Sequence, residues 1–489
     1  MANFFENLYQ KRDCKSHPYH EEVENTIARL SNDQFCDRDG VDRMPTAREV
    51  YDVIAAKKNG KATTDWKNEL LKRGGEEMVL FILPVIKSFW REETPPQQWN
   101  MGIITSVWKG KGDREQLINH RGITVSSAIG TIAEEILFKR VTNIAQFTQA
   151  QAGGRKGGST ADHVFVLRNV IALSMKQKKK TIITFYDVVK AYDRADMDDM
   201  LVTMNASGVK GKIGRLMRSI NEGLKAKVNA KAGLSREIVR ETGGKQGGKL
   251  IVSLFAKMMD TLATDLFGKG LGIKIGEEVI PTLLFVDDSI TFADGYKQQE
   301  DTLKVVDEFA VKHKIEWGAA KSQTMEVGNH KEQRQTWNLG EKVIKKCDSY
   351  RYLGDVIMRN GKNQENLKER LEKVKNNVRA IITCCRSEVM KRIGTRIAFQ
   401  LHESVTIASM LLNAETWTLN MTEKKAIDRA EVYAWKKMLG LPITTPTAGV
   451  VVTVGSLFAS IRVAKKNSCF CKKSSKETRN TGRGLPFLR

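Results

Sequence analysis

Two adjacent carboxylates between two short β-like segments constrain the fold more than any other feature of this chain. Residues 283–286 are apolar, residues 289–292 read as a second strand, and Asp287 and Asp288 stand between them. Two such runs around a two-residue turn predict a β-hairpin. Carboxylates at a hairpin tip pack poorly, but they suit a hard divalent cation such as Mg²⁺, which prefers oxygen ligands. Taken alone, the pair is more often an ordinary turn, because Asp is a common turn residue.

A second segment repeats this pattern. Residues 181–186 form a β-rich run that ends at Asp187. With Asp287 and Asp288 it supplies three carboxylates, which is enough for two divalent metals. Two metals are the template for in-line phosphoryl transfer, because one lowers the pKa of an attacking hydroxyl and the other neutralises the leaving phosphate. The three aspartates are therefore the predicted catalytic and metal-binding residues, although a single Asp at a strand end is also common without a function.

Phosphoryl transfer also needs cations that hold the phosphates. Lys109 and Lys111 lie in a basic loop, and Arg121 follows it, where its guanidinium could fork onto phosphate oxygens. Residues 243–248 are Gly-Gly-Lys-Gln-Gly-Gly and open a long apolar helix, so bare backbone at Gln246 and Gly247 could approach a ligand closely. A flexible loop is the alternative interpretation of that glycine run.

The composition favours a polyanionic partner. The chain has 489 residues, with 80 Lys and Arg against 57 Asp and Glu, a formal net charge of +23. The basic residues are spread along the chain, as in a nucleic-acid channel, although a solvated basic surface is the alternative. The seven cysteines form no repeated CxxC pattern, so we expect free thiols in a reducing compartment. No apolar run is long enough to span a bilayer, and the N-terminus does not read as a signal peptide.

Taken in order, these segments resemble the reverse transcriptases of LINE-type (non-LTR) retrotransposons. Phe285-Val286-Asp287-Asp288 is similar to the family's Phe-Ala-Asp-Asp box, and residues 187–193 are similar to its strand acid followed by Lys-Ala-Phe-Asp. Further boxes that resemble the family lie at residues 119–123, 154–160, 245–248, 350–354, 415–419 and 439–442. The resemblance covers residues 45–460, and the ordered set is far more specific than any single box.

The resemblance implies an α/β (α+β) fold: a right-hand polymerase with fingers, an antiparallel-sheet palm, and a helical thumb and C-terminal region. The implied divisions are an N-terminal extension at 1–45, fingers at 46–180, a palm with the catalytic aspartates at 181–340, a thumb at 341–415 and a helical C-terminal region with a basic tail at 416–489. The last stretch, residues 465–489, is rich in Lys, Arg, Ser, Thr and Gly. We expect it to be disordered and to attract nucleic acid.

The resemblance also implies roles for single residues. Asp187, Asp287 and Asp288 would hold two Mg²⁺ ions, or Mn²⁺ in their place, with help from the backbone of Val188. Tyr192 would stack under the sugar and exclude a ribose 2′-hydroxyl. The other residues implied for nucleotide binding are Lys109, Lys111, Arg121, Gln246, Gly247 and Lys321. The residues implied for the primer and template are Arg155, Tyr352, Leu353 and Gly354.

The implied activity is RNA-directed DNA polymerisation: a primer 3′-hydroxyl attacks the α-phosphate of a dNTP on an RNA template. The implied partners are the RNA template, a DNA primer or target and dNTPs, with no membrane. An element of this family also carries an endonuclease. We read this chain as starting in the linker before the polymerase, so a separate endonuclease would nick the target. The expected location is the nucleus, and the cytoplasm as a ribonucleoprotein, in both cases an intracellular and reducing environment.

Two alternatives stay open. The chain could be a catalytically inactive, nucleic-acid-binding relic of such an element, although its aspartates are intact. It could also be an RNA-templated RNA polymerase, but a bulky Tyr192 argues against ribonucleotides. Departures from the family pattern include Lys249 in place of Pro, Gly154 in place of Phe, and changed segments at 63–67 and 251–253. These departures affect the expected template grip and leave the predicted metal ligands in place.

Overall fold

The computed structural model describes residues 1–12, 14–30, 40–155, 157–230, 232–245, 247–328, 335–385 and 394–481. The first lobe is built on a four-stranded sheet in the order β2-β1-β4-β5. Its strands are β1 (Met101–Trp108), β2 (His120–Val125), β4 (Lys225–Ala230) and β5 (Gly233–Val239). The helices of this lobe are α1 (Ala2–Tyr9), α2 (Pro18–Leu30), α3 (Ala47–Ala56), α4 (Asn68–Arg73), α5 (Gly75–Glu92) and α6 (Ala128–Ile144). Because β4 pairs in parallel with β1, residues far apart in the chain share this sheet.

A six-stranded sheet forms the base of the molecule, in the order β11-β12-β10-β3-β9-β8. Its strands are β3 (Thr181–Tyr186), β8 (Thr282–Phe285), β9 (Asp288–Ala293), β10 (Gln323–Val327), β11 (Thr336–Leu339) and β12 (Lys342–Lys346). Two small hairpins accompany it, β6 (Ile273–Ile275) with β7 (Glu278–Ile280), and β13 (Ser349–Tyr352) with β14 (Asp355–Met358). The predicted hairpin around Asp287 and Asp288 is confirmed, since β8 pairs antiparallel with β9.

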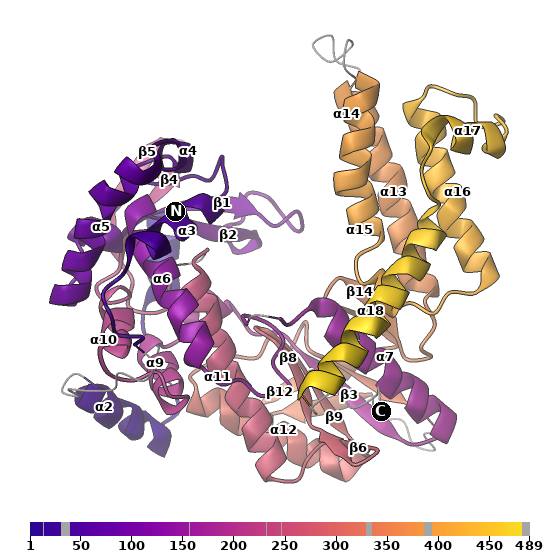
Figure 1. Ribbon diagram of the computed structural model, residues 1–489. Coiled ribbons are helices and arrows are strands. Elements are labelled where there is room, and N and C mark those ends of the chain that lie inside the picture. Colours follow the sequence, from indigo (N-terminus) through magenta and orange to yellow (C-terminus); the bar gives the residue numbers. More distant parts are fainter. Residues whose placement is uncertain are drawn as a thin grey trace.

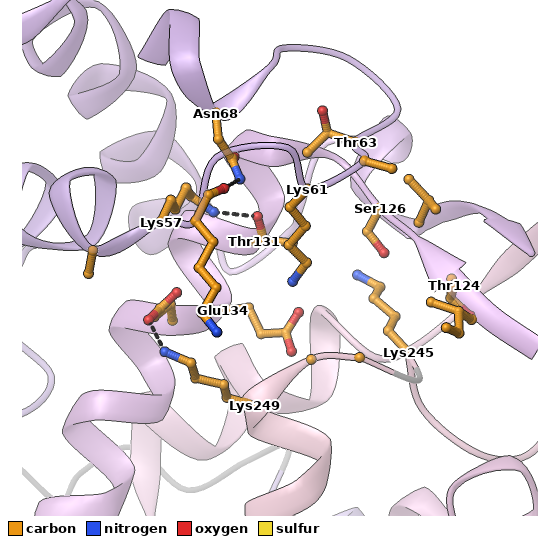
Figure 2. A pocket seen from close by; sticks show the side chains of 18 residues that line it. Lys57, Lys61, Thr63, Asn68, Thr124, Ser126, Thr131, Glu134, Lys245 and Lys249 are labelled. Carbon is orange, nitrogen blue, oxygen red and sulfur yellow. Dashed lines mark hydrogen bonds and ion pairs between the residues drawn. The ribbon is translucent and has the colours of Figure 1, made fainter. Parts of the chain in front are cut away.

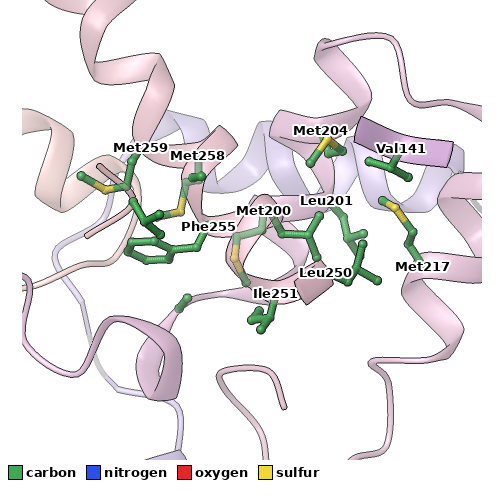
Figure 3. Close-up of a cluster of buried hydrophobic side chains, with 14 of the residues drawn as sticks. Val141, Met200, Leu201, Met204, Met217, Leu250, Ile251, Phe255, Met258 and Met259 are labelled. Atoms are coloured by element: carbon green, nitrogen blue, oxygen red, sulfur yellow. The ribbon is translucent and has the colours of Figure 1, made fainter. Parts of the chain in front are cut away.

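Helices join the two sheets through one large hydrophobic core. They are α8 (Ala191–Arg194), α9 (Met197–Ala206), α10 (Gly211–Ser219), α11 (Lys249–Gly268) and α12 (Tyr296–Lys312). Helix α7 (Thr160–Gln177) packs instead in a separate core with Ile183, Phe185 and Ile290 of the six-stranded sheet. Figure 3 shows α11 contributing Phe255, Met258 and Met259 to a cluster in which α9 supplies Met200 and Met204. Interiors pack at crystal-like density, so this methionine-rich cluster fixes the start of α11 against the base.

The C-terminal region is helical, with a hydrophobic core of its own. It contains α13 (Gln364–Cys385), α14 (Gly394–Leu401), a π-helical turn (His402–Ile407), α15 (Ala408–Met410), α16 (Met421–Met438), α17 (Thr447–Val454) and α18 (Ala459–Thr481). In Figure 1 the four-stranded-sheet lobe and this helical region rise from opposite ends of the six-stranded base. The mixed α/β fold with a helical C-terminal region, as expected of a right-hand polymerase, is confirmed.

The expected disorder of the C-terminal tail is wrong for residues 465–481, which belong to α18. The helix is fixed by contacts that a composition argument cannot show. The Lys466 ammonium lies 3.0 Å from the Leu411 carbonyl, and the Asn467 amide donates to the Trp417 carbonyl at 3.1 Å. Residues 482–489 lie outside the described residues.

Within the described ranges, no single helix has both the length and the apolar character needed to cross a bilayer. One bent pair, α17 with the segment 459–470 of α18, meets that criterion when taken together, on length and composition alone.

Candidate active site

The register of the six-stranded sheet brings the predicted acids to one edge. β3 pairs antiparallel with β9, and Tyr186 lies opposite Ser289. Asp187 directly follows Tyr186 and Asp288 directly precedes Ser289, so the ends of two paired strands carry these carboxylates side by side. The β8–β9 turn adds Asp287 next to them. Asp187 and the adjacent pair Asp287 and Asp288, about a hundred residues later in the sequence, therefore share one site.

The turn that carries Asp287 has a strained backbone, and a buried side chain stabilises it through hydrogen bonds. Val286 has a φ of 61°, a left-handed conformation that is unfavourable for a β-branched residue. The side chain of buried Gln151 stabilises it: Oε1 accepts the amide hydrogens of Val286 at 3.1 Å and of Gly153 at 2.9 Å. Sequence reasoning did not select Gln151, because nothing in the single sequence links it to a turn 135 residues away.

The carboxylates repel one another, and this shifts their titration. The surrounding protein desolvates Asp287 and raises its pKa; Asp187 adds to the rise, whereas Arg121 and a hydrogen bond from Tyr192 reduce it. Asp288 stays open to solvent at the start of β9, yet desolvation, Asp287 and Asp187 together raise its pKa to about 6. A group whose charged form is disfavoured in this way gains most from an added cation. The three carboxylates therefore carry more negative charge than the neighbouring cations of the chain neutralise.

Lys321 is the cation nearest to this edge that the structure shows. Its ammonium contacts both carboxylate oxygens of Asp187, at 2.9 and 3.2 Å, while its side chain stays 73% exposed. The Asp187 amide donates to the hydroxyl of Ser322 at 3.2 Å, which orients the end of β3. Val188 pairs with Trp317 in an isolated antiparallel β-bridge. Its two hydrogen bonds use the Asp187 carbonyl and the Val189 amide, so the Val188 carbonyl takes no part in the bridge.

These groups fit divalent cations in chemistry, as three carboxylates and a backbone carbonyl are hard oxygen donors. In the part of the chain described here, however, no group of three or more acidic, His or Cys side chains converges closely enough to be a ready-made metal cluster. Asp187 instead turns to Lys321, and Asp287 accepts from Tyr192. The strands set the three acids on one edge, and the side chains of Asp187 and Asp287 engage protein donors.

The residues implied for nucleotide binding surround this edge to different degrees. Tyr192 lies half-buried on α8, with its ring centroid 5.6 Å from that of Phe255. Arg121 is exposed on β2 and acts electrostatically on Asp287. Gly247 adopts a φ of 114° just before α11, which only glycine tolerates well. Gln246 lies outside the described residues.

The two candidate lysines of the basic loop have different neighbours. Lys109 is exposed, and its ammonium donates to the Ile118 carbonyl at 3.2 Å. It also helps to lower the pKa of Lys190, next to the Tyr192 helix, after desolvation, which is the larger cause. Lys111 acts instead on Lys373 of α13, as the last and smallest of the causes that lower the pKa of Lys373. Lys109 is therefore within electrostatic range of Lys190, and Lys111 is within electrostatic range of Lys373 on α13.

The residues implied for the primer and template lie at the junction with the helical region. The Leu353 carbonyl accepts from Asn413 at 3.0 Å, and the Gly354 carbonyl accepts from Arg370 at 2.7 Å. Tyr352 is fully buried, with its hydroxyl 3.3 Å from His163. Arg155 is half-buried and donates to the Thr148 carbonyl at 3.2 Å.

Tyr350, two residues earlier on the same strand, also lies beside the acids, and Asp187 and Asp288 act electrostatically on it. Its ring stacks on Phe185 at 4.1 Å, and its hydroxyl donates to the Lys321 carbonyl at 3.1 Å. Side chains alternate along a strand, so a Tyr-Arg-Tyr pattern places both tyrosines on one face without showing which is nearer the acids. Sequence reasoning missed Tyr350 for this reason.

A basic cavity of about 450 Å³ adjoins the site (Figure 2). Lysines 57, 61, 245 and 249 surround the carboxyl group of Glu134. Burial lowers the pKa of both Lys57 and Lys245 to about 8, and burial raises that of Glu134. A second, open cavity of about 760 Å³ shares Gly247, Gly248 and Lys249 with it and extends to Lys139 and Arg155. Together they form a basic groove that runs from β2 along α6.

Comparison with known proteins agrees with this geometry. Residues 109–357 match the family described as reverse transcriptase (RNA-dependent DNA polymerase). A retrovirus-related Pol polyprotein from the type-1 retrotransposable element R2 of Popillia japonica is 28% identical over 234 residues, which are 47% of this chain and 33% of that protein. A probable RNA-directed DNA polymerase from transposon X-element of Drosophila melanogaster is 26% identical over 48% of this chain and 27% of its own length.

A third relative extends the match. The Pol polyprotein from the type-2 retrotransposable element R2DM of Drosophila melanogaster is 24% identical over 340 residues, 68% of this chain and 31% of that protein. The chain thus spans about a third of the length of the curated relatives it matches. The family match covers 109–357, just over half of the chain, and includes all three aspartates. The family that the motifs indicated is confirmed, and this protein belongs to the reverse transcriptase (RNA-dependent DNA polymerase) family.

Proposed function

We propose that this chain is the RNA-directed DNA polymerase of a non-LTR retrotransposon. The observation that carries the proposal is the strand register that sets Asp187 and Asp288 side by side, with Asp287 in the adjoining turn. The raised pKa values of Asp287 and Asp288 support it, since these carboxylates gain from external cations.

In the proposed reaction, the primer 3′-oxygen attacks the α-phosphorus of a dNTP, and the bond to the β-phosphate breaks to release pyrophosphate. Asp187, Asp287, Asp288 and the Val188 carbonyl would hold divalent cations, with Mg²⁺ as the expected ion and Mn²⁺ as a substitute. Bound there, two cations would neutralise phosphate charge and lower the pKa of the primer hydroxyl. Arg121 and Lys109 would bind the triphosphate, with Arg121 suited to a two-pronged contact.

The basic groove supports an RNA template as the partner of this site. It begins at Ile123 and Thr124 of β2, on the strand that carries Arg121, and passes Gly247 and Gly248, where exposed backbone allows close approach. Lysines and Arg155 would contact phosphates without reading bases, so the binding should weaken as salt rises. A DNA primer would lie toward the β13–β14 turn and α13. An endonuclease would supply the nick, and the nucleus would be the place of action.

Primer extension on an annealed RNA template with dNTPs tests the proposal, with Mg²⁺ and Mn²⁺ in parallel and the Asp287→Ala protein beside the wild type. Template-length product from the wild type alone supports an RNA-directed DNA polymerase. If neither protein extends the primer, yet both bind RNA tightly and in a salt-sensitive way, the chain is a nucleic-acid-binding relic and the proposal is wrong. Retained extension by Asp287→Ala would show that the metal ligands are misassigned.

A further inference from the structure

Helix α1 covers the face of the four-stranded sheet opposite to Arg121. Phe5 and Tyr9 are almost fully buried in a small core with Ile104, Val228 and Ile238 from β1, β4 and β5. Side chains alternate between the two faces of a strand. Gly122 therefore faces α1, and its neighbour Arg121 faces the other way and is exposed.

Phe5 lies directly against the strand that carries Arg121. A Cβ atom added to Gly122 would come within 2.5 Å of the Phe5 ring, so nothing separates the ring from the β2 backbone. Arg121 acts on Asp287 from the opposite face of that strand. A shift of α1 would therefore displace β2 at the residue that precedes the phenylalanine contact, and with it the guanidinium.

Tyr9 connects α1 to the segment that leads into Gly247. Its carbonyl accepts the amide hydrogens of Glu241 and Thr242, at 3.1 and 3.0 Å. Its ring lies under the Arg240 guanidinium at 4.0 Å, and Arg240 donates to the Gly244 carbonyl at 2.5 Å and to the Thr124 hydroxyl at 3.1 Å. One buried arginine thus links α1, β2 and the glycine segment.

The same tyrosine faces the helix of the predicted sugar-selecting residue. Its hydroxyl is buried opposite the buried carboxyl group of Asp193, which directly follows Tyr192. The Thr242 hydroxyl lies 3.2 Å from the carbonyls of both Tyr9 and Asp193. The Gly244 amide then donates to the Tyr192 carbonyl at 3.2 Å. Tyr9 therefore contacts the two segments between which Tyr192 is held.

We propose that α1 is a positioning element of the nucleotide site: Phe5 sets the place of Arg121, and Tyr9 sets the place of Tyr192. This inference rests on the proposed polymerase function. It assigns no chemistry to Phe5 or Tyr9, since both act through the backbone and side chains that they contact. The consequence is a site whose affinity for dNTPs and whose choice of sugar depend on a helix behind the sheet.

The test compares Tyr9→Phe with Tyr19→Phe. Tyr19 is a matched control. It lies in the same N-terminal segment as Tyr9, but its hydroxyl donates to Asp199 of α9, at 3.0 Å. We expect Tyr9→Phe, which removes the hydroxyl that faces the Asp193 carboxyl group, to raise the KM for dNTPs about fivefold, an effect typical of one lost polar contact, and to weaken discrimination against ribonucleotides while kcat changes little. Tyr19→Phe should change stability alone. Equal KM and sugar selection in Tyr9→Phe and wild type would overturn the inference, even if Tyr9→Phe melts earlier.

A second variant and a second measurement cover a Tyr9→Phe protein that fails to fold. Thr242→Val conserves volume and removes the hydroxyl between the Tyr9 and Asp193 carbonyls, so it should shift KM in the same direction. Amide hydrogen exchange needs no activity: the Gly243 and Gly244 amides should exchange faster in Thr242→Val than in Tyr19→Phe, and equal rates contradict the inference. If the wild type does not extend a primer, the proposed function fails, and the exchange rates still decide whether α1 holds this segment.

Discussion

Asp355 and the acids of the β3–β9 edge show how the surroundings of an aspartate decide whether it has a structural or a ligand-binding role. Asp355 at the junction of the six-stranded base and the helical region is completely buried. Arg370 contacts one of its oxygens at 2.7 Å, while Arg168 and the Trp417 indole contact the other at 3.0 and 3.2 Å. Its charge is met by two guanidinium groups inside the chain. It fastens α7, β14 and α13 to one another.

The acids of the β3–β9 edge are the opposite case. They lie partly open to solvent, repel one another, and meet a neutral tyrosine and one largely exposed lysine. A buried charge that the chain fully pairs is structural, since removing one partner leaves the other uncompensated. Charges that the chain leaves short of partners are costly unless something else binds them. The comparison supports the proposal that the β3–β9 edge binds external cations.

The largest effect should come from Asp288→Asn. We expect primer extension to fall more than about a hundredfold, because even an outer-shell partner of a bound metal can be worth that much. The Tm should not fall, since the change removes one of several repelling charges. Asp294→Asn, at an exposed position just after β9, is the control and should leave extension unchanged. A loss of stability in Asp288→Asn as large as that at Asp355 would erase the difference between the two groups.

Asp355→Asn should have the opposite effect and lower the stability of the protein. Breaking a buried ion pair costs about 3–5 kcal/mol, so denaturant unfolding should show a loss of that order. The control Asp348→Asn removes a carboxylate that is 80% exposed and pairs with Arg359 at 3.0 Å. It should cost less than about 1 kcal/mol, as surface pairs do. A similar loss for both variants would mean that the guanidinium groups around Asp355 do not act as a buried network.

Glu431 on α16 sharpens the comparison, because it is buried and only partly compensated. It accepts the Ala459 amide at 2.6 Å and lies 3.4 Å from Arg462. Burial raises its pKa from 4.5 to about 7 despite Arg462, and Glu403 and Asp428 add to the rise. Between these two pH values the folded protein binds more protons than the unfolded chain. Stability should therefore fall as pH rises from 4.5 to about 7, and the full cost should be present above that window.

Glu431→Gln should flatten this pH dependence and stabilise the protein by about 3.5 kcal/mol at pH 8, since the pKa rises from 4.5 to about 7 and each pKa unit corresponds to about 1.4 kcal/mol. Unfolding free energies between pH 4 and pH 8 measure it. Glu372→Gln, an exposed position on α13, is the control. An unchanged slope in Glu431→Gln would show that Arg462 compensates Glu431 as fully as the arginines compensate Asp355.

The sequence predicted the local parts of this site well. The hairpin with Asp287 and Asp288, the strand that ends at Asp187, and the family were all within reach of short motifs. Contacts between distant segments were not. Three of these contacts depend on tertiary packing that no local pattern records. They are the hydrogen bond from the Val286 amide to Gln151, the parallel pairing of β1 with β4, and the burial of Tyr352, which is complete where that of Tyr350 is partial. The expected disorder was wrong for residues 465–481, because the polar composition of this segment hides the contacts that fix α18.

The smallest effect concerns Tyr192, which gives Asp287 a neutral hydroxyl where Asp355 has cations. The two functions of this side chain can be separated. Tyr192→Phe keeps the ring against Phe255 and removes the hydroxyl from Asp287, so sugar selection should persist. Tyr192→Ala removes the ring, and the relative kcat/KM for ribonucleotides over deoxynucleotides should rise about tenfold, a typical gain when one steric contact is lost. If the ratio stays constant in Tyr192→Ala, the ring does not select the sugar. A rise in Tyr192→Phe alone would place selection in the hydroxyl and its bond to Asp287, which would make that bond part of substrate choice as well as of the charge balance at the β3–β9 edge.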